Sequence, residues 1–258
     1  LQLAAEYAQT QRSIKTDDKV VFITIDDGGT ADPKVTEIIR KTGIPVTPFM
    51  TENVTRSNKA YFKEISEMTG QIVQNHTVDH PQMPTLSLAG QEKQLCQASK
   101  NYAEWFGANP WMVRPPYGEF NNTTREASKA CGLSYVVLWN VSLPAAFLRY
   151  AQGDKLKPGD IILTHWRPDL YKHLPRALKD IKRQGFKVAA LQDYLPAPVE
   201  PQFWCDSPAG RAISPNLEES AERMVRVTWS GRVVRSSQVK RRTSQPALTR
   251  RFCLVRSC

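Results

Sequence analysis

Between residues 19 and 195, short apolar runs alternate with longer stretches in which apolar residues recur every three or four positions. The short runs are typical of buried strands, and the longer stretches have the period of amphipathic helices. We predict strands at residues 20–25, 45–50, 71–75, 111–114, 135–139, 160–164 and 187–190. We predict helices at residues 32–42, 57–69, 87–106, 121–131 and 171–184.

Strands that alternate with helices predict an α/β fold, with a parallel sheet and helices outside it. About seven strands favour a closed or nearly closed barrel over an open doubly wound sheet. The chain of 258 residues is 41% apolar, which is enough for a substantial core. We divide it into an N-terminal segment at 1–17, a folded domain at 18–198 and a tail at 199–258.

The alternation stops after Leu195–Pro198, and the tail is rich in Arg, Ser and Pro. Residues 1–198 hold 24 basic and 20 acidic side chains, whereas residues 199–258 hold 11 and 5. The net charge of +10 is therefore concentrated in the tail, for which we predict a flexible, basic segment of uncertain structure. Such a tail favours anionic polymers or surfaces, but it has few aromatic residues and no motif for specific nucleic-acid binding.

Hydropathy, the start of the chain and the cysteines further limit the class of protein. No apolar run reaches the ~18 residues of a membrane span, so we predict no transmembrane segment. The chain begins at Leu1 without a charged-then-apolar signal, which indicates a trimmed or processed start. Cys96 and Cys131 fall on predicted helices and are candidates for a disulfide. The other cysteines lie in the tail, and because the total of five is odd, at least one is unpaired within a monomer.

The candidate catalytic and metal-binding residues lie at the ends of predicted strands. Asp26 and Asp27 end the first strand and precede two glycines, and His76 and His80 stand four residues apart. By itself, an acidic pair before glycines is typical of a turn or a helix cap. One carboxylate and two imidazoles nevertheless suffice for a three-ligand metal site, and the second carboxylate is then free to act as a base. Together they indicate metal-assisted hydrolysis.

Four segments in order, Thr24–Gly28, His76–His80, Arg114–Tyr117 and Leu163–His165, resemble the motif series of the polysaccharide deacetylases. This family is also known as the NodB homology group, or carbohydrate esterase family 4. The resemblance covers residues 18 to 196, and it implies that 18–198 is a catalytic domain with a distorted (β/α)7 barrel. Barrels of this type assemble their chemistry at the C-terminal ends of the strands, which is where these motifs fall.

The resemblance also implies a function. We expect a hydrolase that removes acetyl groups from an acetylated glycan. An N-acetylglucosamine polymer is favoured, and acetylated xylan is compatible with the same motifs. The family's substrates imply a secreted or cell-surface protein that acts on the cell wall, and we expect a monomer. The implied cofactor is a divalent metal, with zinc favoured and cobalt or nickel suited to the same ligands.

Carried over by position, the metal ligands are Asp27, His76 and His80, and the catalytic base is Asp26. Arg114 is implied to hold that base, because a guanidinium keeps a carboxylate ionised and oriented.

On the substrate side, the resemblance makes His165 the acid that protonates the leaving group and Leu163 a wall of the acetyl pocket. The backbone N–H of Tyr117 is implied to hold the oxyanion, after a turn that Pro116 helps to fix. Phe147, Trp139 and Trp166 are candidates to replace the tryptophan that lines the family's substrate groove.

The chain departs from the family after the strand at 135–139. The family has an Asp and then an Asp-Trp pair there, whereas Asn140–Phe147 contains no acid. Ser142 and Ala145 stand roughly where the carboxylates belong. The missing acid normally orients the catalytic histidine, and the unranked replacements are Asp154, Asp160 and Asp169. This loss motivates the alternative function, a glycan-binding protein that keeps the metal but has weak or lost catalysis.

Overall fold

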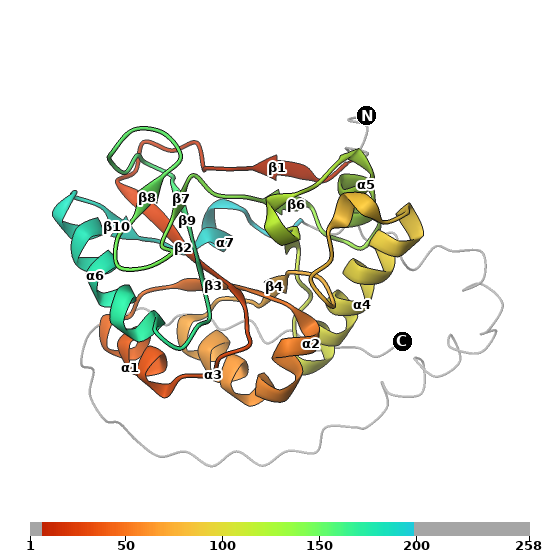
Figure 1. Cartoon of the computed structure of the whole chain (residues 1–258), viewed down its shortest axis with the longest axis horizontal. Coiled ribbons are helices and arrows are strands. Elements are labelled where there is room, and N and C mark those ends of the chain that lie inside the picture. Colours follow the sequence, from red (N-terminus) through yellow and green to blue (C-terminus); the bar gives the residue numbers. More distant parts are fainter. Residues whose placement is uncertain (1–6, 199–258) are drawn as a thin grey trace, which may run out of the picture. The chain divides into compact units, whose positions relative to one another are not determined.

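The structure is a computed structural model, and it describes residues 7–198. A single sheet runs through this part of the chain (Figure 1). Its strands are β1 (Gln9–Gln11), β2 (Val20–Asp27), β3 (Val46–Met50), β4 (Gln74–Asn75), β5 (Met112–Val113), β6 (Tyr135–Val137), β7 (Val141–Ser142), β8 (Arg149–Tyr150), β9 (Ile161–His165) and β10 (Lys187–Val188).

The strand order is β1-β6-β5-β4-β3-β2-β9-β7-β8, and β10 also pairs with β2. All pairs are parallel except the antiparallel pair of β7 and β8. Within the described residues, β1 and β8 lie at the two ends of this order, so the sheet is a curled, open barrel. The predicted α/β fold of the NodB type is confirmed.

Helices cover the sheet, and all five predicted helices are present (Figure 1). They are α1 (Pro33–Thr42), α2 (Glu52–Thr55), α3 (Lys59–Thr69), α4 (Leu88–Phe106), α5 (Asn122–Ala130), α6 (Leu170–Arg183) and α7 (Leu191–Tyr194). Short 3-10 turns lie at Arg56–Asn58, Met83–Thr85 and Pro116–Gly118. No helix in residues 7–198 is both long and apolar enough to cross a membrane.

Local sequence explains where the longer helices begin and end. α1 begins after Asp32, whose carboxylate accepts from the Lys34 N–H at 2.9 Å, and it ends at Gly43 with a positive φ of 64°. α4 begins after Ser87 and ends at Gly107 in the same way. Helix α6 buries one stripe of its surface, made by Leu170, Leu174, Ala177 and Ile181.

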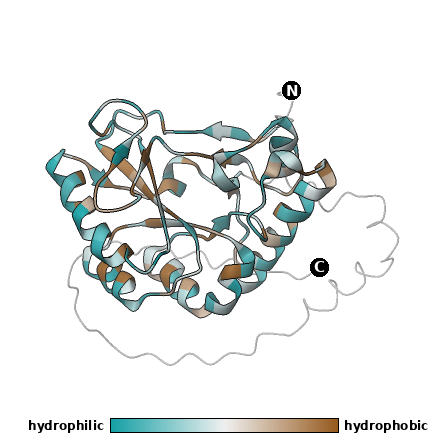
Figure 2. Cartoon of the chain, in the orientation of Figure 1, coloured by the Kyte–Doolittle hydropathy of each residue, from teal (hydrophilic) through white to brown (hydrophobic). Residues whose placement is uncertain are grey.

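The core lies between the sheet and these helices. Figure 2 shows hydrophobic residues along β2 and β3, whereas the ribbon of α6 is mainly hydrophilic. On the other flank, a disulfide joins Cys96 of α4 to Cys131, which follows α5. This is the pairing for which the sequence made the two cysteines candidates. It ties together two helices that pack beside strands β4 to β6.

The structure differs from the predicted elements at short or polar segments. Strand β1 has the sequence Gln-Thr-Gln and no apolar run, yet it pairs with β6, so the sheet extends into the predicted N-terminal segment. Strands β7 and β8 have two residues each, too few for a periodic pattern. The predicted tail at 199–258 lies outside the described residues.

Candidate metal centre

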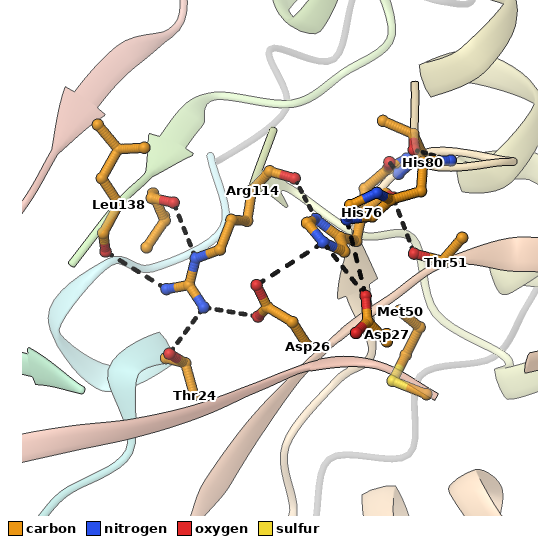
Figure 3. A network of polar contacts seen from close by, with 12 residues as sticks. Thr24, Asp26, Asp27, Met50, Thr51, His76, His80, Arg114 and Leu138 are labelled. Carbon is orange, nitrogen blue, oxygen red and sulfur yellow. Dashed lines mark hydrogen bonds and ion pairs between the residues drawn. The ribbon is translucent and has the colours of Figure 1, made fainter. Parts of the chain in front are cut away.

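The predicted metal ligands and base converge at the C-terminal edge of the sheet. Asp26 and Asp27 are the last two residues of β2, and His76 directly follows β4. Arg114 directly follows β5, the next strand in the sheet. Figure 3 shows the two imidazoles facing the two carboxylates, with the guanidinium on the far side of Asp26.

Asp27, His76 and His80 form a cluster in which one ligand atom from each lies within 4.8 Å of the others. The Asp27 Oδ1 atom is 3.6 Å from His76 Nε2 and 3.8 Å from His80 Nε2. Two ligands held tetrahedrally at ~2.0–2.1 Å from one ion are about 3.4 Å apart. These separations are too long for hydrogen bonds but close to that spacing, so the three side chains fit a zinc-sized ion.

The His76 ring is held in the form that a metal needs. Its Nδ1 atom lies 2.5 Å from the carbonyl oxygen of Arg114, so the proton sits on Nδ1 and the lone pair on Nε2. Nε2 faces the cluster. Burial lowers the pKa of His76 below its ordinary value, although the nearby Asp26 carboxylate opposes this effect. The ring is therefore kept neutral and oriented for coordination.

The loop that joins the two histidines, residues 76–80, is hereafter the ligand loop. Each of its N–H groups from Thr77 to His80 donates to a side-chain oxygen. The acceptors are Asn75 Oδ1 for Thr77 at 2.8 Å, Gln94 Oε1 for Val78 at 3.1 Å and for Asp79 at 3.2 Å, and Thr77 Oγ1 for His80 at 3.1 Å. A single amide oxygen on α4 thus caps two consecutive residues between the metal ligands.

The carbonyl side of the ligand loop is also satisfied. The carbonyl oxygens of Thr77 and Val78 accept from the first N–H groups of α2, those of Glu52 and Asn53, at 3.0 and 2.9 Å. The Asn75 side chain in turn donates to the Leu95 carbonyl of α4 at 2.9 Å. The loop is therefore fixed from two sides, by α2 and by α4.

Backbone strain concentrates at the same place. Asp27, Thr77, His80 and Tyr117 have φ angles of 80°, 70°, 62° and 60°, and they are the only non-glycine residues with positive φ in residues 7–198. Such conformations cost about 1–3 kcal/mol each, and they persist where the surroundings enforce them. For Thr77 and His80, these surroundings include the hydrogen bonds of the ligand loop.

Asp26 is held by a fully buried guanidinium. Arg114 Nη1 lies 2.7 Å from Asp26 Oδ1 and 2.8 Å from the hydroxyl of Thr24. Its other donors reach the carbonyl oxygens of Val137 and Leu138 at 3.1 and 3.3 Å. Burial lowers the pKa of Arg114, and the Asp26 carboxylate opposes that shift.

The second carboxylate oxygen of Asp26 is not bound by Arg114 and faces the metal cluster. Its Oδ2 lies 3.7 Å from His76 Nε2, on the side of the metal cluster. A carboxylate that is pinned at one oxygen and directed at a metal site by the other is oriented to accept a proton there.

The turn after Arg114 presents Tyr117. The Tyr117 ring is 61% exposed and packs edge-on against His80, with ring centroids 4.7 Å apart. Its N–H donates to no acceptor within residues 7–198, and Pro116 beside it is buried. Trp139 is half-buried beneath this turn, where a Cβ on Gly118 would lie 2.9 Å from its ring. The turn thus places a free N–H and an exposed aromatic ring beside the metal ligands.

His165 ends β9, and its Cα is the register partner of Asp26. No carboxylate oxygen in residues 7–198 lies within 4.0 Å of its ring nitrogens. The three candidate replacements are engaged elsewhere or lie apart from it. Asp160 accepts from the Lys157 N–H at the other end of β9, Asp169 pairs with Arg167 and His173, and Asp154 lies in the exposed segment before Leu156.

Two residues predicted to contact substrate are buried. Trp166 is 4% exposed, and its ring packs edge-on against Phe62 and Tyr61 at 5.1 and 5.9 Å. Its interpretation as a groove-lining residue was wrong, because it points into the core beneath α3. Leu163 is also buried, in the strand that carries His165.

The sequence analysis missed several residues that hold the site. Thr24 was detectable, because it lies two residues before Asp26 in a strand and so shares its face. Gln94 had no such signal, since it is one of several glutamines on a long amphipathic helix. Only the fold brings it to the ligand loop.

Comparisons with known proteins agree with this geometry. Residues 13–136 match the family described as Polysaccharide deacetylase. An uncharacterised protein of Streptomyces coelicolor is 37% identical over 192 residues, which cover 70% of this chain and 75% of that protein. The peptidoglycan-N-acetylmuramic acid deacetylase PdaA of Bacillus subtilis is 25% identical over 193 residues, which cover 70% of this chain and 73% of PdaA.

Among solved structures, a family 4 carbohydrate esterase pseudoenzyme from Bacillus anthracis superposes with a TM-score of 0.63 at 23% identity. The match covers 72% of this chain and 68% of that one. At this identity it supports the fold alone. The motifs, the family match and the Streptomyces relative together show that this chain belongs to the polysaccharide deacetylase family of NodB type.

Proposed function

We propose that this protein is a metal-dependent deacetylase that hydrolyses acetyl groups on a cell-wall glycan, with an N-acetylglucosamine polymer as the favoured substrate. The observation that carries the proposal is Asp26, which is fixed by Arg114 at one oxygen and faces the Asp27, His76 and His80 cluster with the other. Relatives named as peptidoglycan deacetylases support the substrate class.

Asp27, His76 and His80 would hold the divalent ion, most suitably zinc, with cobalt or nickel as alternatives. When bound, such an ion polarises the acetyl carbonyl and acidifies water. Asp26 then takes the proton from the attacking water, and Arg114 keeps the carboxylate in place as its charge changes. The Tyr117 N–H donates to the oxyanion that develops on the acetyl group. His165 gives a proton to the departing amine or alcohol.

The disulfide between Cys96 and Cys131 supports a location outside the reducing cytosol, at the cell surface or beyond. This agrees with a wall glycan as substrate.

The test is acetate release from N-acetylglucosamine oligomers, peptidoglycan and acetylated xylan. Each is incubated with metal-stripped protein, and then with zinc added back. We expect zinc-restored release that Asp26→Ala abolishes. Asp79→Ala is the matched control, because this exposed acid lies between the ligands. Equal loss of acetate release in Asp26→Ala and Asp79→Ala, or acetate release that needs no metal, would contradict a metal-dependent deacetylase with Asp26 as its base.

A second function is favoured by one observation: no carboxylate oxygen in residues 7–198 lies within 4.0 Å of the His165 ring nitrogens. A protein that retains the metal and binds glycan, with weak or lost catalysis, fits that gap. Glycan affinity measured by calorimetry, together with metal binding but no acetate release from any substrate, would favour it.

A further inference from the structure

A cavity of about 900 Å³ lies between α6 and residues 146–158, and the proposed reaction assigns no step to the residues that line it. We call it the α6 cavity. Lys19 and Pro158 line it, and they precede the starts of β2 and β9. The catalytic residues stand at the opposite ends of these strands. At ~3.3 Å per strand residue, Lys19 and Asp26 are about 23 Å apart along the chain.

The floor of the α6 cavity is apolar and preformed. Leu148, Leu156, Ala177 and Phe186 line it, and all four are buried members of the main core cluster. Phe147 also lines the cavity but is 80% exposed, the most exposed large apolar side chain in residues 7–198. An aromatic ring left in solvent over an apolar floor is suited to stacking against a planar or ring-shaped ligand.

The rim of the cavity is strongly positive. Its basic residues are Lys19, Lys155, Lys157, Arg176, Lys179 and Arg183, and its acidic residues are Asp154 and Asp180. Only Arg183 has an ion-pair partner, which is Asp180. The other basic side chains have no carboxylate oxygen within 4.0 Å in residues 7–198. Several unpaired cations around one cavity complement an anionic ligand.

We propose that the α6 cavity is a second binding site, separate from the metal centre, for an anionic glycan whose sugar rings carry carboxylate or phosphate groups. The lysines and Arg176 pair with the anionic groups, and the Phe147 ring stacks on a sugar face. The chain's own tail is not the complement, because residues 199–258 hold 11 basic and 5 acidic side chains. The site would hold the enzyme on a charged polymer while the metal centre works elsewhere.

The test is titration of the full chain with oligogalacturonate, a carboxylated glycan, at low salt. Lys155→Glu with Lys179→Glu should weaken binding about tenfold or more, since both variants replace attraction by repulsion. Lys63→Glu with Lys100→Glu is the control, because it makes the same charge change at exposed positions on α3 and α4. It should change Kd less than about twofold.

Phe147→Ala separates a glycan from other anions. It should weaken oligogalacturonate binding severalfold and leave the binding of polyglutamate unchanged. Equal weakening by both charge-reversal pairs would show diffuse attraction, and would overturn the cavity as the site. Polyglutamate bound as tightly as oligogalacturonate, with no effect of Phe147→Ala, would overturn the glycan as the ligand. Neither readout needs acetyl hydrolysis, so the proposed catalytic function is not at stake.

Discussion

The ligand loop and the segment from Asn140 to Leu148 lie at the same edge of the sheet. They differ in how completely their functional groups are held by neighbouring side chains. In the ligand loop, every N–H between the metal ligands has a side-chain acceptor, and strained φ angles are held in place. In the second segment the family's acids are absent, and no carboxylate oxygen in residues 7–198 lies within 4.0 Å of the His165 ring nitrogens.

For the proposed function, the difference separates the metal and base side of the site, where the motif residues are all present, from the acid side, where the family's carboxylates are absent. Hydrogen bonds hold the proposed base, Asp26, to Arg114 and fix the ligand loop that carries the proposed metal ligands. The proposed acid, His165, has no carboxylate oxygen within 4.0 Å of its ring nitrogens in residues 7–198. We therefore expect substitutions on the metal and base side to cost much more than substitutions around His165.

The largest effect is expected at the base. Asp26→Asn keeps the shape and an acceptor for Arg114 but removes the proton acceptor, so kcat should fall about 10²–10⁴-fold. Metal content, measured by atomic absorption, should stay within a factor of two of wild type by our estimate. A fall in kcat that zinc excess repairs would instead place Asp26 in the metal site.

A smaller effect is expected at Gln94, whose side-chain oxygen accepts from two N–H groups of the ligand loop. Gln94→Leu leaves two N–H groups unpaired, so metal affinity should fall about 10–100-fold, as for other residues that orient ligands. Gln94→Glu retains the acceptor and should recover most of the affinity. Gln97→Leu, at an exposed position on the same helix, is the control. Affinity is measured by competition with a chromogenic chelator. If Gln94→Leu lowers thermal stability but not metal affinity, the capping bonds do not position the ligands.

Restoring a carboxylate in the second segment, Asn140–Leu148, tests whether its loss limits proton donation by His165. Ser142→Asp places a carboxylate on β7, next to the strand that ends in His165, and should raise kcat severalfold if orientation limits proton donation. Ser142→Asn has nearly the same shape without the charge and should leave kcat unchanged. Equal rates for the two variants at all pH values would mean that proton delivery does not limit turnover.

The smallest effect is expected at Asp160, which sits at the far end of β9 from His165. Burial raises its pKa, so in the folded state it takes up a proton more readily than in the unfolded state. Its contribution to stability is therefore present below its ordinary pKa and is lost as the pH rises through the raised value. Relative to Asp160→Asn, wild type should become more stable as the pH falls from 7 to 3, measured by urea unfolding. A shifted kcat–pH profile would instead connect Asp160 to His165.

The sequence was sufficient for the main strands, and it placed Asp26 and His165 where apolar runs end, at the C-terminal edge of a parallel sheet. It was insufficient where a contact depends on tertiary placement. Gln94 lies sixteen residues beyond Val78, on a helix whose pattern does not distinguish it from its neighbours. Trp166 follows His165 in sequence, yet the strand's alternation turns its ring toward the core.

The pairing of β2 with β9 has a consequence for how this protein can vary. Asp26 and His165 are register partners, so the proposed base and the proposed acid lie side by side on neighbouring strands. A single-residue insertion or deletion inside either strand would move one of them to the opposite face while leaving every motif legible in the sequence. Related chains can therefore tolerate length changes in the connections, but a homologue with an altered spacing inside β2 or β9 should be regarded as inactive until tested.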